Sequence, residues 1–241
     1  MPKSERQQIS IVPSSPRYAE QMQDLMHAVY NTTRENPEGT FSADMFRHHM
    51  QIFPEGQFIA LEAGRVVGLT ASMRIAFDPA HPFIEPWFTT ISSGWLTRHD
   101  PRAEWMYGVE SCVHPDYQSY GIGSKLMQAR FDTAMALNLR GMVAGSDIMD
   151  YYKVAGFVSP VAYMSSVVAG KRFDNNLSKQ LKKGFKAVAL IPDYLPEPGM
   201  PGWGVVIVWD NPTFDPAQPI GTMLITPRRY RFTPRSRAAT S

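Results

Sequence analysis

The sequence contains only one cysteine, Cys112, among its 241 residues, so no disulfide can form within the chain. It has no apolar run long enough to cross a membrane, and its polar N-terminus lacks the apolar segment of a signal peptide. Acidic and basic residues nearly balance to a formal net charge of +2, which does not indicate a nucleic-acid partner. We therefore expect a cytoplasmic protein that does not associate with a membrane.

Charged residues are also few, at 19%, whereas hydrophobic residues make up 44% of the chain. This balance allows a buried core and excludes an intrinsically disordered chain. Because we find no internal repeat and no linker, we predict one domain over residues 1–212, followed by a C-terminal extension over residues 213–241. The extension ends in a basic tail, which is typical of a flexible terminus, with an arm for phosphates or an acidic partner as the alternative. Its arginines include Arg228, Arg229, Arg231, Arg235 and Arg237.

Hydrophobic periodicity predicts the elements of the first half of the chain. Apolar residues at helical spacing indicate two helices, and two apolar runs joined by Ala63-Gly64 indicate an antiparallel hairpin. Residues 78–103 follow as a long loop rich in proline and aromatic residues, which either has a function or covers the edge of the core. The predicted elements are a strand at 9–12, helices at 16–30 and 43–52, and strands at 57–62 and 65–77.

The second half of the chain is predicted to begin with a strand, a glycine turn, a helix and a further strand. This order indicates a parallel strand pair joined by a right-handed crossover. Two later segments look like a helix that ends at Gly-Phe, and only the second is followed by strands, so we interpret residues 146–174 as an insertion. The elements are strands at 105–113, 140–145, 186–191 and 204–209, helices to about 138 and to 169, and Gly-Phe endings at 156–157 and 184–185.

The chemistry is concentrated in the turn Val113-His114-Pro115-Asp116-Tyr117-Gln118-Ser119-Tyr120-Gly121-Ile122-Gly123. Gly121 and Gly123 remove side chains at the start of a helix, where unpaired N–H groups and the helix dipole favour an anion such as a pyrophosphate. The turn lacks the third glycine of a dinucleotide fingerprint and the Gly-Lys-Ser/Thr of a Walker A loop. Its place between an apolar strand and an amphipathic helix is typical of a phosphate-binding turn, with glycines that serve only close packing as the alternative.

The pattern Gln118-x-x-Gly121-x-Gly123, after a strand that ends at Val113, resembles the acetyl-CoA motif of the GCN5-related N-acetyltransferases (GNAT). The predicted order of elements is similar to that family as well. More narrowly, residues 97–101, 137–145 and 177–195 resemble the GNAT-like domain that is fused to carbon-nitrogen hydrolases in some bacterial proteins. The resemblance implies an α/β (α+β) fold with a mixed central sheet of about six to seven strands and helices on both faces.

The resemblance also implies where a thioester donor binds. The end of the strand would lie along the pantetheine arm, and the turn would wrap the pyrophosphate. Gln118 replaces the arginine that is commoner in the family, which weakens the attraction for phosphates. A carrier-bound phosphopantetheine thioester is therefore an alternative to acetyl-CoA or another acyl-CoA. The donor-binding residues implied in this way are Cys112, Val113, Gln118, Ser119, Tyr120, Gly121, Ile122, Gly123 and Ser124.

Acylation of an amine needs a base that takes a proton from the nitrogen. Glu110, on the strand before the turn, is our first candidate because burial would raise its pKa. His114 is a candidate for a proton relay, and transfer through water without a dedicated base stays open. Many family members use a tyrosine in Tyr-x-x-x-Gly-Phe to protonate the leaving thiolate. Tyr152 has this spacing but lies in the insertion beside Tyr151, whereas the last helix offers Gln180 at that place.

We therefore predict an enzyme, an N-acyltransferase that moves an acyl group from a pantetheine thioester to the amine of a small molecule. His81, His99 and Asp100 do not form a convincing metal set, so we expect no metal. An acidic acyl carrier protein is a candidate partner, and a homodimer is compatible with the sequence. One alternative is a catalytically inactive GNAT-like module that binds thioesters or partners. A protein acetyltransferase is another, although the sequence indicates no peptide groove.

Overall fold

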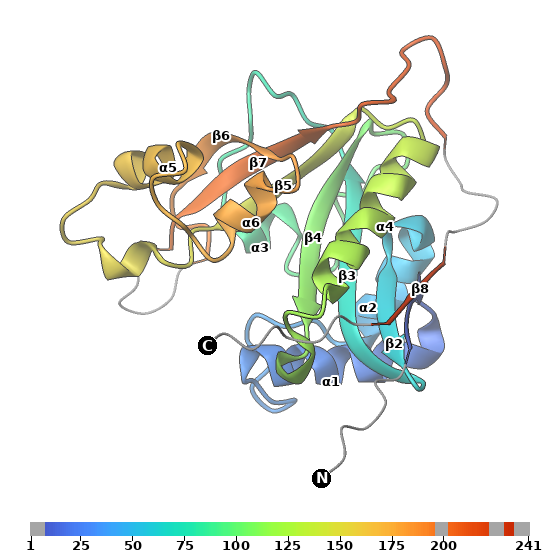
Figure 1. Ribbon diagram of the computed structural model, residues 1–241. Helices are drawn as coiled ribbons and strands as arrows, with labels where there is room; N and C mark the ends of the chain where they lie inside the picture. Colours follow the sequence, from blue (N-terminus) through green and yellow to red (C-terminus); the bar gives the residue numbers. More distant parts are fainter. Residues whose placement is uncertain (1–7, 196–201, 222–228, 234–241) are drawn as a thin grey trace.

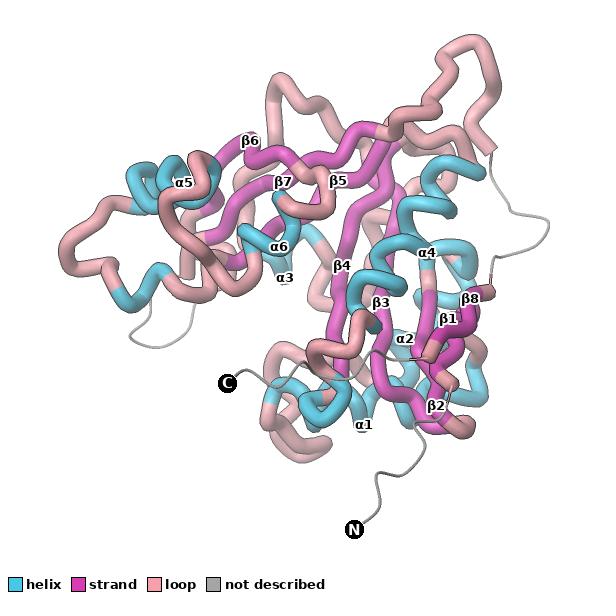
Figure 2. The backbone as a smooth tube through the Cα atoms, viewed as in Figure 1, coloured by secondary structure: helices cyan, strands magenta, loops and turns pink. Residues whose placement is uncertain are grey.

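The computed structural model describes residues 8–195, 202–221 and 229–233, which form one mixed sheet with helices on both faces (Figures 1 and 2). The sheet has eight strands, and most neighbouring strands run antiparallel. Across the sheet the order is β6 (Lys186–Ile191), β7 (Gly204–Asp210), β5 (Gly141–Asp147), β4 (Trp105–Val113), β3 (Arg65–Ile75), β2 (Phe58–Glu62), β1 (Ile9–Pro13) and β8 (Tyr230–Phe232).

The helices divide between the two faces of the sheet. On one face α1 (Ala19–Tyr30), α2 (Ala43–Ile52) and α3 (Trp87–Thr90) share a core cluster with β3 and β4. On the other face α4 (Ile122–Ala136), α5 (Pro160–Val168) and α6 (Leu177–Leu181) pack against β5 and β7. Short 3₁₀ turns lie at Pro16–Tyr18, Pro54–Gly56, Pro115–Tyr117 (η3) and Tyr151–Lys153 (η4). None of the described helices is long and apolar enough to span a bilayer.

The predicted fold class is confirmed, and the predicted strands and helices lie within a few residues of the observed ones. The short helix α3 interrupts the predicted loop at 78–103. The sheet has one strand more than the upper expected number, because β8 adds to its edge. Tyr230 pairs with Ile11 and Phe232 pairs with Ile9. Three residues are too few for a period-two pattern to be recognised in a basic segment.

Two described parts of the C-terminal extension contact the rest of the domain. Arg231 lies in β8 with an exposed side chain, and Arg229 directly precedes the strand. Before it, Gly221 donates a hydrogen bond to Leu137 O, and the buried Arg74 donates through Nη1 to Gly221 O. The extension thus packs beside the end of α4. Arg228, Arg235 and Arg237 lie outside the described residues.

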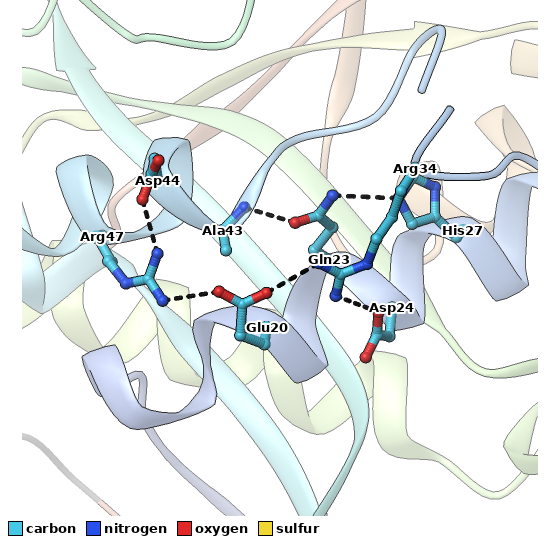
Figure 3. A network of polar contacts seen from close by, with 8 residues as sticks. All are labelled: Glu20, Gln23, Asp24, His27, Arg34, Ala43, Asp44 and Arg47. Carbon is cyan, nitrogen blue, oxygen red and sulfur yellow. Dashed lines mark hydrogen bonds and ion pairs between the residues drawn. The ribbon is translucent and has the colours of Figure 1, made fainter. Parts of the chain in front are cut away.

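Polar contacts hold α1 against α2 (Figure 3). Arg47 of α2 donates to Glu20 of α1 across 2.8 Å, and Arg34 donates to the same carboxylate across 3.1 Å. These exposed ion pairs each contribute little to stability. The buried Gln23, by contrast, accepts a hydrogen bond of 2.9 Å from the backbone N–H of Ala43 at the start of α2. These contacts join α1 to α2, and α1 ends at Tyr30.

The parallel strands β4 and β5 diverge soon after they meet. Their pairing covers Trp105 with Gly141, Met106 with Met142, and Tyr107 with Val143. Beyond these positions β4 stays paired with β3 as far as Val113, and β5 stays paired with β7. We call the region between residues 108–113 of β4 and residues 144–146 of β5 the fork. It opens toward the end of β4, where the glycine turn begins.

Candidate active site

A β-bulge lies at the closed end of the fork. In the antiparallel pairing of β3 with β4, Ser72 pairs with Gly108, whereas the adjacent Ala71 pairs with Glu110. Val109 is therefore the extra residue on β4. Val109 belongs to the core cluster on the α1 face, and Glu110 bonds to α1 on that same face. The bulge therefore turns two consecutive side chains toward one face, as such irregularities do. It places the carboxylate of Glu110 at the edge of the fork.

The carboxylate of Glu110 is partly exposed and is held by two hydrogen bonds. Its Oε1 accepts from Tyr30 Oη at 2.8 Å and from the backbone N–H of Ser111 at 2.8 Å. Burial raises the pKa of Glu110, whereas these two bonds and the nearby charge of Arg130 lower it. The net shift is upward. A carboxylate with a raised pKa in reach of solvent is suited to accept a proton near neutral pH.

The predicted loop at 78–103 anchors the bulge. Trp87 donates a hydrogen bond of 3.1 Å through its indole Nε1 to Val109 O, and its backbone N–H donates to Tyr194 O across 2.9 Å. The indole is buried and stacks on Phe41 at a centroid distance of 5.7 Å. The loop thereby fixes the carbonyl of the bulged residue. Neither Trp87 nor Tyr30 was selected from the sequence, because their roles depend on contacts distant in the chain.

Two buried tyrosines fill the closed end of the fork on this face. Burial raises the pKa of Tyr107 to about 12, and hydrogen bonds from its surroundings, among them Tyr194, lower it. The ring of Tyr194 lies against β5 and β7. A Cβ added to Gly145 or Gly204 would overlap that ring, so both positions need glycine. The paired tyrosines form a rigid wall beside the bulge.

The glycine turn joins β4 to α4 on the open side of the fork (Figure 1). Ser119 and Gly121 have φ angles of 69° and 85°, which only glycine adopts at little cost. Gly121 is the N-cap of α4, with no side-chain hydrogen bond to the first turn and no acidic residue in it, within the described part of the chain. A Cβ on Gly123 would meet only Val113 Cγ2, at 3.9 Å. The first N–H groups of α4 are therefore bare and can bind an anion.

The other predicted donor-binding residues surround this turn. Ile122 is buried and packs its Cγ2 beside Gly68, which anchors the start of α4. Gln118 donates a long hydrogen bond of 3.5 Å to Val113 O. Cys112 is buried in the core, and burial raises the pKa of its thiol. Tyr120 and Ser124 lie on either side of the two glycines.

His114 and Tyr152 form no hydrogen bond with Glu110. His114 is the N-cap of η3, where its Nδ1 accepts from the backbone N–H of Asp116 at 3.3 Å. Tyr152 lies on η4 with half of its surface exposed, and the Lys153 ammonium lies 5.7 Å from its ring centroid. The structure thus brings neither residue into direct contact with the base candidate.

The two Gly-Phe endings differ in the structure. Phe157 is 93% exposed and is followed by α5, whereas Phe185 is buried and leads directly into β6. The strands predicted after the second ending are confirmed. Gln180, four residues before Gly184, lies on α6, and its buried Oε1 has no hydrogen-bond partner among the described residues. The same part of the chain contains no group of three His, Cys, Asp or Glu residues that could hold a metal.

The order of elements, the fork and the glycine turn can now be compared with known proteins. Residues 26–157 match the model of the Acetyltransferase (GNAT) family. The chain belongs to the GNAT family. YkwB of Bacillus subtilis, named as an uncharacterized N-acetyltransferase, is 30% identical over 171 residues, which cover 71% of this chain and 75% of YkwB. This GNAT chain is thus similar to that relative over most of both lengths.

A second relative is similar over only part of its length. YhcX of Bacillus subtilis, named as a probable hydrolase, is 34% identical over 171 residues. These residues are 70% of this chain and 33% of YhcX, so the GNAT chain described here spans about a third of that protein.

Two solved structures share the fold. The GphF GNAT-like decarboxylase, in complex with isobutyryl-CoA, superposes with a TM-score of 0.67 at 21% identity, over 83% of this chain and 98% of GphF. The loading GNATL domain of CurA from Lyngbya majuscula has a TM-score of 0.66 at 17% identity, over 84% of this chain and 98% of that domain. At these identities the likeness establishes the GNAT fold.

Proposed function

We propose that this GNAT-family chain is an N-acyltransferase that moves an acyl group from a pantetheine thioester to the amine of a small molecule. The observation that carries the proposal is the position of the fork. It opens between the bare N-terminus of α4 and the carboxylate of Glu110. A thioester with an anionic head can therefore bind along β4 with its reactive carbonyl at the bulge.

The donor is held by backbone groups more than by side chains. The N–H groups of Ile122, Gly123 and Ser124 and the positive end of the α4 dipole would bind the pyrophosphate. The two amides of the pantetheine arm can pair with the free edge of β4 in the manner of an added strand. Because Gln118 is uncharged, the turn gains little from long-range attraction to phosphates. We therefore keep a carrier-bound thioester as an alternative to a free acyl-CoA.

The transfer step requires one proton to leave the nitrogen and one to reach the sulfur. The amine attacks the thioester carbon while Glu110 accepts a proton from the nitrogen, directly or through one water. Collapse of the tetrahedral intermediate forms the amide and expels the thiolate, which takes a proton. When the amine is neutral, Glu110 takes one proton from the nitrogen and the thiolate receives one proton, so the protons balance over one turnover.

The acid that protonates the thiolate is a separate question. Gln180 of α6 can donate an amide hydrogen bond but no proton. Tyr152 has the spacing that is typical of the family, and its role as the acid stays a prediction. The ring of His114 caps η3, and its role as a proton relay stays a prediction. We favour solvent as the source of the proton, because Glu110 is partly exposed.

Thiol release tests the proposal. The full chain is incubated with acetyl-CoA, longer acyl-CoA esters and carrier-bound esters, each with a panel of small amines. We expect amine-dependent thiol release with at least one donor. Replacing Glu110 by Gln should lower kcat by about 10²–10⁴-fold, the usual contribution of a general base. The matched control is Glu104→Gln, which removes an exposed ion pair with Arg140 and should leave kcat unchanged.

Binding of coenzyme A esters without any thiol release would instead favour the inactive binding module. An equal rate for Glu110→Gln and the unchanged chain would remove Glu110 from the mechanism.

A further inference from the structure

Arg130 of α4 is an arginine buried at the closed end of the fork. Its exposed fraction is 3%. A Cβ added to Gly108 would lie 2.9 Å from Arg130 Nη1 and 3.4 Å from Ala144 Cβ. Gly108 and Ala144 are the first positions beyond the last strand pair, Tyr107 with Val143. The guanidinium therefore lies where β4 and β5 begin to separate, on the face that α4 covers.

The guanidinium of Arg130 has hardly any polar partner. Its Nη2 lies 3.5 Å from Met127 Sδ, a weak acceptor, and its buried Nε has no hydrogen-bond partner among the described residues. No carboxylate within that part of the chain forms an ion pair with it. Burial lowers the pKa of Arg130 to about 10, and the charge of Glu110 partly opposes the shift. Burying a cation without a paired anion is costly, so the guanidinium of Arg130 is suited to bind an anion that arrives with a ligand.

A second cation lies nearby, because Phe185 packs against Phe131 of α4, the residue after Arg130, with ring centroids 5.7 Å apart. Lys183 follows α6 and is partly buried. Burial and the charges of Arg130 and Lys179 lower the pKa of Lys183 to about 8. Both of the neighbours that lower this pKa are cations. Arg130 and Lys183 thus place two cations on the side of α4 and α6, whereas the Glu110 side chain bonds to α1 on the other face.

We propose that Arg130, assisted by Lys183, binds a carboxylate carried by the acyl group itself, so that the preferred donor is the thioester of a dicarboxylic acid such as a malonyl or succinyl group. This inference rests on the proposed function, because it requires a pantetheine thioester in the fork. In the proposed complex the acyl carbon would lie at the bulge, and the guanidinium lies beside the neighbouring Gly108. A carboxylate on a short acyl chain would supply the missing partner through a charge-assisted hydrogen bond.

The test compares donors that differ in charge and share one shape. Malonyl-CoA is matched by isovaleryl-CoA, in which two methyl groups stand in place of the carboxylate oxygens. Succinyl-CoA is matched in the same way by 4-methylpentanoyl-CoA. Dissociation constants of the full chain for all four esters are measured by calorimetry, so that no acceptor amine is needed. We expect at least one anionic ester to bind about tenfold or more tightly than its neutral match.

The variant Arg130→Met should bring this ratio close to one, and Arg130→Lys should keep part of it. Lys183→Met should lower the ratio by a smaller factor. The matched controls are Arg102→Met and Lys182→Met, which remove exposed cations outside the fork and should keep the ratio of the unchanged chain. A melting curve of each variant checks that it folds. If Arg130→Met does not fold, Arg130→Lys and Lys183→Met carry the comparison.

Equal affinities for the charged and neutral esters in the unchanged chain would overturn this inference and leave the proposed function standing. The same ratio in the unchanged chain and in the folded Arg130 variants would overturn it as well. Failure of every coenzyme A ester and every carrier-bound ester to bind would instead overturn the proposed function, and the inference with it.

Discussion

Tyr30 and Glu110 lie 80 positions apart in the sequence, yet the hydroxyl of Tyr30 donates a hydrogen bond of 2.8 Å to Glu110 Oε1. The tyrosine is the last residue of α1, and the glutamate follows the bulge of β4. This bond stabilises the ionised carboxylate and lowers the pKa that burial raises. The end of α1 thus adjusts the pKa of the base candidate on the strand that it packs against.

Replacing Tyr30 by Phe should shift the pH profile of the reaction. The base must be ionised, so activity is lost as the pH falls through the pKa of Glu110. Without the hydrogen bond from Tyr30 that pKa rises, and the acidic limb of kcat/KM should move to higher pH. Rates of thiol release across pH 5 to 9 measure the shift. Tyr18→Phe, on a separate turn beneath Arg17, is the control. An unchanged acidic limb would contradict the coupling between Tyr30 and Glu110.

Replacing Trp87 by Phe should weaken both stability and catalysis. The variant keeps an aromatic ring but loses the hydrogen bond to Val109 O, which should lower the free energy of unfolding by about 1 kcal/mol. The bulge then loses its anchor, and kcat should fall while the affinity for coenzyme A stays close to that of the unchanged chain. Denaturant unfolding and single-donor kinetics measure the two effects. Trp95→Phe removes an exposed indole as a control. A normal kcat in a destabilised Trp87→Phe would mean that the anchor serves the fold alone.

Replacing Gly145 by Ala should destabilise the protein through its contact with Tyr194. The new Cβ would overlap the ring, and overpacking of this kind costs about 1–3 kcal/mol. In a Tyr194→Ala background the same substitution should cost almost nothing. A double-mutant cycle of unfolding free energies tests this, with Gly156→Ala as a control at a position that has open space. Additive effects at positions 145 and 194 would contradict the contact.

Much of the fold follows from short-range patterns in the sequence. The hairpin turn at Ala63-Gly64, the cap at Ser42 and the glycines before α4 each act on neighbouring residues, and each predicted the element that the structure contains. Glu110 could be selected because it lies on the strand that leads into the turn. Its environment could not be predicted, because Tyr30 reaches it from another element.

The remaining features depend on contacts between distant segments. Arg130 looks like an ordinary helix residue in the sequence, and only the packing of α4 on Gly108 shows that its charge is buried. Trp87 belongs to a loop whose proline and aromatic content did not indicate which backbone group the indole would bind. The strand β8 is held by its pairing with β1 rather than by a pattern of its own.

The most direct test of the account is a calorimetric titration of coenzyme A into the unchanged chain and into Gly123→Asp. The position has open space, and an acidic residue in the first turn of α4 interacts favourably with the helix dipole, so the variant should fold with normal or slightly higher stability. Its carboxylate would meet the pyrophosphate at the bare N–H groups. We predict a loss of affinity of about tenfold or more, with Gly156→Asp, at another position with open space, unaffected. Equal affinity of a folded Gly123→Asp for coenzyme A would contradict the account, because the donor would then bind elsewhere.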